Sequence, residues 1–172
     1  MDENQAYRKQ FEEAYEELIE PIFAFLYVRL GDRERARELA QETFMRAWTY
    51  VAHGNRITSF KPFLFTTAYN LFKNELRANK QHRSLEALME ERHYEPASNE
   101  TSAEDRADAR MAMEHVAKLP PAHQEVVIMH YVDGLPIKTI AEILNKPQAT
   151  VSVHLFRALR KLRTLYAHNA HT

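Results

Sequence analysis

The sequence predicts an all-helical protein with a linker-like stretch in its second half, and its 172 residues leave room for one ordinary domain or two small ones. Apolar residues recur at intervals of three and four along most of the chain, which is the period of an amphipathic helix. Glycine occurs only 3 times in 172 residues, which disfavours turn-rich β folds and glycine-loop nucleotide sites. From about Ser84 to Asp108 this period fades, and acidic residues, Pro, Ser and Asn take over, as they do in linkers.

The first half of the chain predicts three helices, over about residues 4–30, 33–52 and 60–81. Pro21 falls inside the first helix and is expected to kink or divide it. Gly31-Asp32 predicts a helix stop followed by an N-cap, and His53–Ser59 predicts a polar loop. The second helix is expected to bury one apolar face, made of Ala36, Leu39, Ala40, Phe44, Ala47, Trp48 and Val51.

The second half predicts four more helices. One runs over about residues 103–118, and Pro120-Pro121 separates it from a helix over residues 123–131. A turn at Asp133-Gly134 leads into Leu135–Arg163, which we expect to form two helices, Ile137–Leu144 and about 148–165. In the helix over 123–131 we expect four apolar side chains to be largely buried, namely Val126, Val127, Met129 and Tyr131.

The stretch Leu135–Arg163 has the pattern of a DNA-reading helix-turn-helix. Asn145 tolerates the left-handed conformation that ends a helix, and Pro147 suits the first turn of the next one. The second helix presents basic side chains, and the stretch has no acidic residue after Glu142. An ordinary helical hairpin with a solvated basic face is the alternative. The side chains left for solvent or a ligand are Ser152, His154, Arg157, Arg160, Lys161 and Arg163.

The helix over residues 60–81 has a second polar feature. Asn70, Asn74 and Arg77 are spaced by four and three and therefore share a face, which basic residues flank. Asn side chains can pair with base edges, and aromatic rings beside Lys and Arg suit single-stranded nucleic acid. The alternative is a core helix whose aromatics simply pack. The flanking basic residues are Lys73, Lys80 and Arg83, and the aromatics are Phe60, Phe65, Tyr69 and Phe72.

Composition excludes several kinds of site. The absence of cysteine removes disulfides, thiolate zinc sites and cysteine nucleophiles. Histidine occurs 9 times, but no HExxH motif or compact carboxylate cluster accompanies His123 and His130, so we expect no metal, no cofactor and no catalytic residue. The N-terminus is too polar for a signal peptide and the run Ile22–Val28 is too short to span a membrane, so we expect a cytoplasmic protein without membrane insertion.

Taken together, four segments resemble an extracytoplasmic-function (ECF) sigma factor of bacterial RNA polymerase. Glu38–Phe44 is similar to the D-L-x-Q-E-x-F core of that family's polymerase-binding helix. Phe60–Arg77 resembles its promoter-melting helix, with Asn70 and Arg77 matching and Asn74 in place of the usual Asp. Leu119–Leu144 and Thr150–Arg163 resemble the C-terminal domain and its recognition helix, although Ser152-Val153-His154 replaces the usual Lys-Ser-Arg. That change removes two positive charges from the recognition face.

The resemblance implies an alternative sigma factor made of two small all-helical domains that a flexible linker joins. Residues 1–84 would bind the clamp region of the large subunit of core RNA polymerase and melt the −10 promoter element, residues 85–108 would be an acidic linker, and residues 109–172 would read the −35 element. The implied polymerase-binding residues are Glu38, Leu39, Gln41, Glu42 and Met45. Those for the −10 element are Asn55, Phe60, Asn70, Lys73, Asn74, Arg77 and Lys80, and those for the −35 element are Thr150, Ser152, His154, Arg157, Arg160 and Lys161. Promoter DNA, duplex and single-stranded, and an anti-sigma factor are the other implied partners.

Two further hypotheses come from the same residues. If His154 faces DNA, its protonation would make binding depend on pH. The whole chain also fits two other classes of protein less well: a stand-alone helix-turn-helix regulator that binds palindromic DNA, and a helical interaction protein that never contacts DNA. The first leaves the Asn70, Asn74 and Arg77 face unexplained, and the second draws on the weakened Ser152-Val153-His154 face.

Overall fold

The computed structural model describes residues 3–82 and 103–169, and every element in this part of the chain is helical. It divides into two compact units, Met1–His93 and Tyr94–Thr172. The prediction of an all-helical, two-domain fold is therefore confirmed. None of the helices in these two ranges is long and apolar enough to cross a membrane. The predicted linker lies largely outside the described residues.

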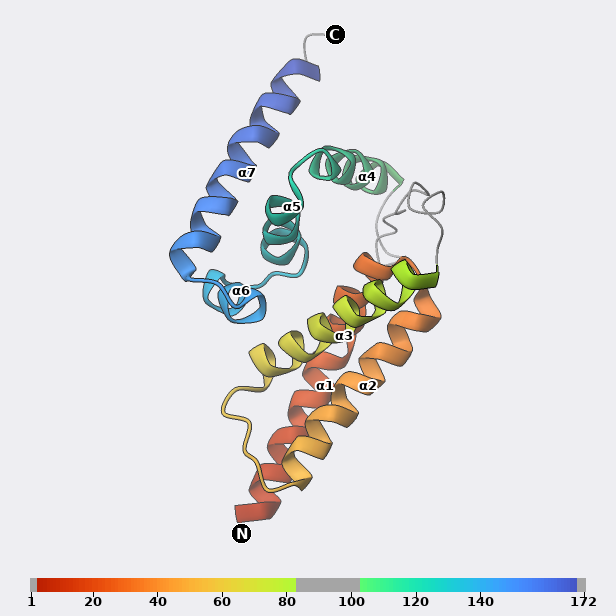
Figure 1. Ribbon diagram of the computed structural model, residues 1–172, viewed down its shortest axis with the longest axis vertical. Helices are drawn as coiled ribbons and strands as arrows, with labels where there is room; N and C mark the ends of the chain where they lie inside the picture. The colour runs from red at the N-terminus through yellow and green to blue at the C-terminus, as the bar shows by residue number, and fades with distance from the viewer. Residues whose placement is uncertain (1–2, 83–102, 170–172) are drawn as a thin grey trace. The chain divides into compact units, whose positions relative to one another are not determined.

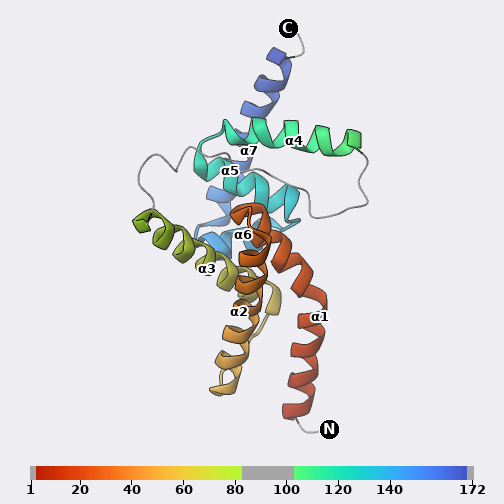
Figure 2. The same cartoon turned by 90° about the vertical axis from the view of Figure 1, so that its right-hand side faces the viewer.

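The N-terminal unit is a bundle of three helices that all pack against one another: α1 (Glu3–Leu30), α2 (Arg33–Ala52) and α3 (Phe60–His82). Figures 1 and 2 show α3 running at an angle across the other two helices. Pro21 was expected to kink or divide this helix, and α1 continues through it undivided. The core between the helices consists mainly of Leu18, Ile22, Phe25, Leu26, Leu39, Phe44, Leu64, Phe65, Leu71 and Phe72.

The turn between α1 and α2 has the predicted chemistry. Gly31 ends α1 with a φ of 68°, a conformation that side chains with a Cβ rarely adopt. Asp32 then caps α2, because its Oδ1 accepts a hydrogen bond from the backbone N–H of Arg35 at 3.0 Å. This cap fixes where α2 begins and therefore which of its residues face the core.

The C-terminal unit contains α4 (Ala103–Ala117), α5 (Pro121–Val127), a π-helical turn (Ile128–Val132), α6 (Ile137–Leu144) and α7 (Gln148–Asn169). Helix α7 packs against α5 and α6, and it continues four residues beyond the predicted end at Leu165. The expected burial of Val126, Val127 and Met129 is confirmed. Tyr131 was expected to be buried but is 59% exposed, because the wider π turn changes which side chains point inward.

The turn between α6 and α7 forms as expected. Asn145 adopts the left-handed conformation, with φ and ψ both 50°. The N–H of Lys146 donates to the carbonyl of Ala141 at 2.9 Å, which satisfies one of the last carbonyls of α6. Val151, Leu155 and Ala158 of α7 are then buried in the unit. The helix-turn-helix of the sequence prediction is therefore present.

Candidate nucleic-acid and polymerase interfaces

One side of α2 carries a continuous line of accessible side chains. It consists of Glu38, Gln41, Glu42, Met45 and Trp48, which we call the α2 stripe. Glu42 is half-buried and pairs with Arg46, whose Nη2 lies 2.6 Å from its Oε1, and the other four are exposed. Met45 and Trp48 are 69% and 46% exposed, unusually accessible for large apolar side chains.

Two sequence assignments on α2 differ from the structure. Leu39 was counted among the polymerase-binding residues, but it is 2% exposed and belongs to the core. Trp48 was assigned to the buried face, but its ring lies at the edge of that face, where it meets Phe11 edge-on with centroids 5.2 Å apart. Its spacing of three from Met45 is the sequence signal that places it on the α2 stripe.

The polar face predicted on α3 is present. Asn70, Asn74 and Arg77 are all exposed, and we call these three residues the α3 polar face. Lys73, beside them, is half-buried, with its Nζ 4.9 Å from the ring centroid of Tyr69. The side chain of Lys80 lies outside the described residues, and so does Arg83.

The aromatic residues of α3 serve mainly the core. Phe65 and Phe72 are 1% and 4% exposed, and Phe65 meets Phe25 edge-on at 5.2 Å. Phe60, a candidate for DNA contact, is half-buried between α1 residues, with its ring centroid 5.9 Å from that of Tyr7 and 5.8 Å from that of Phe11. Core packing therefore accounts for Phe60, Phe65 and Phe72, in agreement with the alternative that the aromatics of this helix simply pack.

Two hydrogen bonds tie the loop over residues 53–59 to α2 and α1. Asn55, a candidate for DNA contact, is exposed and donates a hydrogen bond from Nδ2 to the carbonyl of Tyr50 at 3.0 Å. Ile57 is 6% exposed, and its backbone N–H donates to the Tyr7 hydroxyl at 2.8 Å. These contacts hold the loop against α1 and leave Asn55 at the surface.

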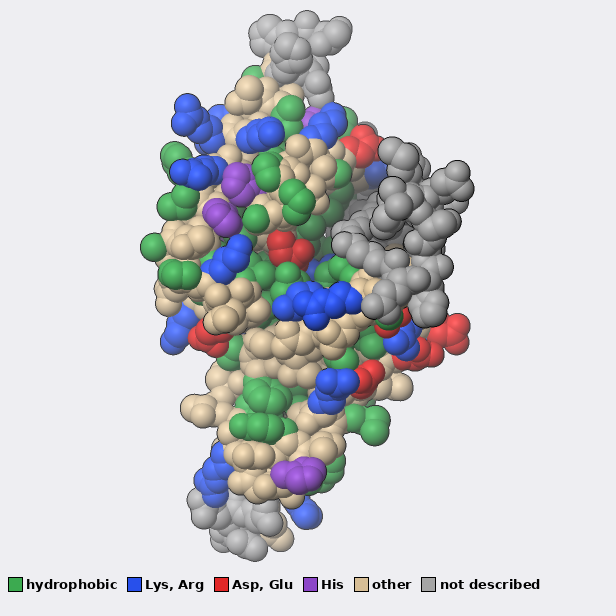
Figure 3. Space-filling model, viewed as in Figure 1, with side chains coloured by type: hydrophobic (Ala, Val, Ile, Leu, Met, Phe, Trp, Pro, Cys, Tyr) green, Lys and Arg blue, Asp and Glu red, His purple; other side chains and the backbone are tan. Residues whose placement is uncertain are grey.

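The exposed side of α7 is basic and partly apolar. Ser152, Arg157, Arg160 and Lys161 are exposed, and Thr150 is half-buried. Figure 3 shows Lys and Arg side chains along the surface where α7 lies in Figure 1, with histidines among them. Two apolar residues that the sequence analysis left unassigned also lie on this helix, Val153 at 44% and Phe156 at 68% exposed.

His154 is less accessible than the sequence suggested. It is half-buried, and its ring lies against His123 of α5 with the centroids 5.3 Å apart. Burial of His123, followed by the nearby positive charges of His154, Arg157 and Lys161, lowers the pKa of His123 below its ordinary value. Both rings are therefore held at the seam between α5 and α7.

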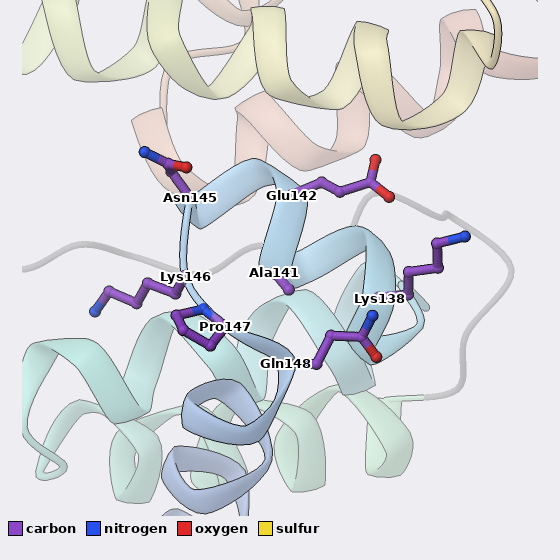
Figure 4. A pocket seen from close by; sticks show the side chains of 7 residues that line it. All are labelled: Lys138, Ala141, Glu142, Asn145, Lys146, Pro147 and Gln148. Atoms are coloured by element: carbon purple, nitrogen blue, oxygen red, sulfur yellow. The ribbon is translucent and has the colours of Figure 1, made fainter.

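A shallow, open pocket of about 440 Å³ lies at the turn of the helix-turn-helix (Figure 4). Five of its seven lining residues are polar or charged, whereas small-molecule pockets are lined mainly by hydrophobic and aromatic side chains. It is formed by Lys138, Ala141, Glu142, Asn145, Lys146, Pro147 and Gln148.

Comparison with known families matches both units. The family model described as sigma-70 region 2 matches residues 14–82, and the one described as sigma-70, region 4 matches residues 110–162. Together they cover more than half of the chain. The first matched range contains α2 and α3, and the second contains the helix-turn-helix.

Two relatives from one organism match along most of their length. The chain is 28% identical over 160 residues to the ECF RNA polymerase sigma factor SigM of Bacillus subtilis, covering 90% of this chain and 94% of SigM. It is 28% identical over 151 residues to SigW of the same organism, covering 83% of this chain and 81% of SigW.

Two solved structures share the fold. The sigma factor RpoE of Bartonella quintana, in complex with the anti-sigma factor NepR, superposes with a TM-score of 0.72 at 20% identity, covering 92% of this chain and 98% of that one. CnrH, in complex with the cytosolic domain of CnrY, gives 0.64 at 17% identity, covering 94% and 90%. The region 2 and region 4 matches and the relatives agree with the four segments identified in the sequence. The chain therefore belongs to the ECF group of the sigma-70 family and is an alternative sigma factor for transcription initiation by RNA polymerase.

Proposed function

We propose that residues 1–84 dock on the clamp region of the large polymerase subunit through the α2 stripe and capture the −10 element with the α3 polar face. The proposal rests on how one three-helix bundle divides its residues between core and surface. Its interior takes up the large apolar residues, while two separate sets of accessible side chains remain on α2 and α3. Exposed Met45 and Trp48 suit a protein partner, because large apolar and aromatic side chains anchor such interfaces.

The α3 polar face suits the unwound strand of the promoter. Asn70 and Asn74 offer amide groups to base edges, and Arg77 offers charge to phosphates. Extruding a base costs a few kcal/mol. Because Phe65 and Phe72 are buried, aromatic stacking by these rings is not available to offset that cost. We therefore assign capture to the amide and guanidinium groups, with Asn55 of the loop over 53–59 and Lys73 beside them.

We propose that residues 109–172 hold the duplex −35 element with α7. Arg157, Arg160 and Lys161 are long, charged and exposed, so they suit phosphate contacts that set the position of the helix. Thr150 and Ser152 lie nearest the start of the helix, which is the end that reads bases in helix-turn-helix proteins. His154, packed against His123, would act by shaping this edge rather than by reaching into the groove.

Four further properties complete the proposal. The protein acts in the cytoplasm, where polymerase and promoter are, and residues 85–108 act as a linker between the two domains. It has no catalytic activity of its own, since the polymerase supplies the chemistry. RpoE and CnrH are each described in complex with a partner, NepR or the cytosolic domain of CnrY, which supports an anti-sigma factor as a partner of this chain.

The experiment is in vitro transcription from a promoter library. The purified chain is added to core RNA polymerase, and the run-off transcripts are sequenced. We expect initiation from promoters that share one motif at −10 and one at −35. Failure to bind the polymerase would rule out the proposal, and binding to palindromic duplex DNA without polymerase would support a stand-alone regulator instead.

A further inference from the structure

Arg35, in the first turn of α2, holds two carboxylates at once. Its Nε and Nη2 atoms donate to Oε1 and Oε2 of Glu75 on α3, at 3.0 and 2.7 Å. Its Nη1 atom donates to Oε2 of Glu38, one turn along α2, at 2.6 Å. A two-pronged contact between a guanidinium and a carboxylate fixes orientation as well as distance. Arg35 therefore holds α2 and α3 in one defined relative geometry.

Glu75 lies where α3 leaves the core. Leu71 and Phe72 are 5% and 4% exposed, Glu75 is half-buried, and Arg77 is exposed. Apolar packing thus anchors α3 firmly as far as Phe72 and more weakly beyond it. Asn74 and Arg77 of the α3 polar face belong to this less buried part, on either side of Glu75. The pair of hydrogen bonds from Arg35 to Glu75, which we call the fork, therefore holds the part of α3 that carries Asn74 and Arg77.

The third hydrogen bond of Arg35, from Nη1, goes to Glu38 of the α2 stripe. Glu38 is exposed, so its carboxylate is accessible to a partner while it accepts from Arg35. A cation of the polymerase that paired with Glu38 would compete with Nη1 of Arg35. The two hydrogen bonds to Glu75 would then be the principal contact of the guanidinium. One side chain would thus respond to polymerase docking and orient α3.

We propose that Arg35 is a positioning residue that couples the α2 stripe to the α3 polar face through Glu75. The proposal rests on the function assigned above to these two surfaces. The side chains of Arg35 and Glu75 are 39% and 20% exposed, so solvent only partly screens their charges. Loss of the contact leaves the polymerase-binding surface in place and lets the end of α3 vary in orientation.

The test separates polymerase binding from promoter opening. Arg35→Met and Glu75→Gln remove the contact, Arg35→Lys keeps the charge without the fork, and the double variant Arg35→Glu/Glu75→Arg restores opposite charges in reversed order. Lys9→Met is the matched control, because it removes an exposed pair with Glu13, at 3.7 Å, that lies within α1. For each holoenzyme we would measure polymerase affinity, the permanganate reactivity of unpaired thymines in the −10 element, and the melting temperature of the free protein.

We expect Glu75→Gln and Arg35→Met to lower the open-complex fraction about fivefold, with polymerase affinity changed by less than about twofold. Arg35→Lys should fold as the wild type and still lower opening, the double variant should recover most of the loss, and Lys9→Met should match the wild type. Unchanged opening in Glu75→Gln, or no recovery in a stably folded double variant, would overturn the proposal. Parallel loss of affinity, opening and melting temperature would also overturn it, since it would reduce the contact to a structural role. A wild-type holoenzyme that opens no promoter would instead contradict the proposed function.

Discussion

His123 of α5 and His154 of α7 face each other with ring centroids 5.3 Å apart, and the Nδ1 atom of each is buried without a hydrogen-bond partner among the described residues. Within residues 3–82 and 103–169, neither buried nitrogen has a carboxylate or carbonyl that accepts a hydrogen bond from it. Burial, followed by the positive charges of His154, Arg157 and Lys161, lowers the pKa of His123, so the His123 ring is suited to the neutral state.

The first prediction is that acid destabilises the C-terminal unit through His123. The pKa of His123 is lowered in the folded protein, so below about pH 6.5 the unfolded chain binds a proton that the folded chain resists. Stability is therefore full above that pH and falls as the pH drops towards the folded pKa. Thermal unfolding followed by circular dichroism gives the melting temperature at each pH between 7.5 and 5.5. As the pH is lowered, this temperature should fall less steeply for His123→Gln than for the wild type. His53→Gln, which changes an exposed ring of the other unit, should keep the wild-type slope, and parallel curves for all three proteins would contradict the prediction.

The second prediction concerns the division between polymerase binding and DNA capture. Asn74→Ala should reduce promoter opening while leaving the affinity for core polymerase unchanged, because Asn74 is exposed on the α3 polar face. Gln41→Ala, on the α2 stripe, should do the reverse. Permanganate footprinting and a polymerase titration measure the two effects, and equal defects in both assays would show that the two surfaces are wrongly assigned.

The third prediction separates Leu39 from its neighbours on α2. Leu39 is 2% exposed, so Leu39→Ala should lower the free energy of unfolding by about 2–4 kcal/mol through loss of core packing. Gln41→Ala removes an exposed side chain and should change it by less than about 0.5 kcal/mol. Urea unfolding measures both. A small change for Leu39→Ala would mean that this side chain is not part of the core.

The fourth prediction is that Arg160 contacts a phosphate. In that case Arg160→Ala weakens binding to all sequences alike and reduces the slope of log K against log salt concentration by about one. Ser152→Ala, on the same helix, should leave the slope unchanged and alter the relative affinities of different −35 sequences. Binding of the holoenzyme to labelled promoter DNA over a range of salt concentrations tests both. An unchanged slope in Arg160→Ala would contradict the phosphate contact.

The fifth prediction uses the left-handed conformation of Asn145, whose φ is 50°. Asn145→Ala should destabilise the C-terminal unit by about 1 kcal/mol, because a Cβ is strained there without the local hydrogen bonding that Asn offers. Asn145→Gly should change stability by only a few tenths of a kcal/mol. Urea unfolding of the two variants measures the difference. Equal stabilities would show that the turn relaxes to another conformation.

Much of this architecture could be predicted because it depends on local chemistry. The start of α2 follows from the Asp32 cap, and the end of α6 from the backbone freedom of Asn145. The failures have physical causes of another kind. Trp48 lies roughly a quarter turn or more from the centre of the buried face, so its large ring reaches solvent even though the apolar pattern includes it.

The accessibility of the candidate site residues could be predicted only in part. Asn70, Asn74 and Arg77 share an exposed face because helical spacing alone puts them there. The half-burial of His154 depends on His123, which is distant in the sequence, and the fork from Arg35 to Glu75 spans two helices. Such contacts are set by how the helices pack, and periodicity within one helix carries no information about them.

The π turn at Ile128–Val132 has a consequence for comparing this chain with its relatives. A π turn closes its hydrogen bond one residue later than an α turn, so it holds the equivalent of one inserted residue. The insertion sits between α5, which carries His123, and the helix-turn-helix that follows. A relative whose helix is α-helical throughout should therefore align with a single-residue gap here. The pattern of buried positions before the gap should then be matched separately from the pattern after it.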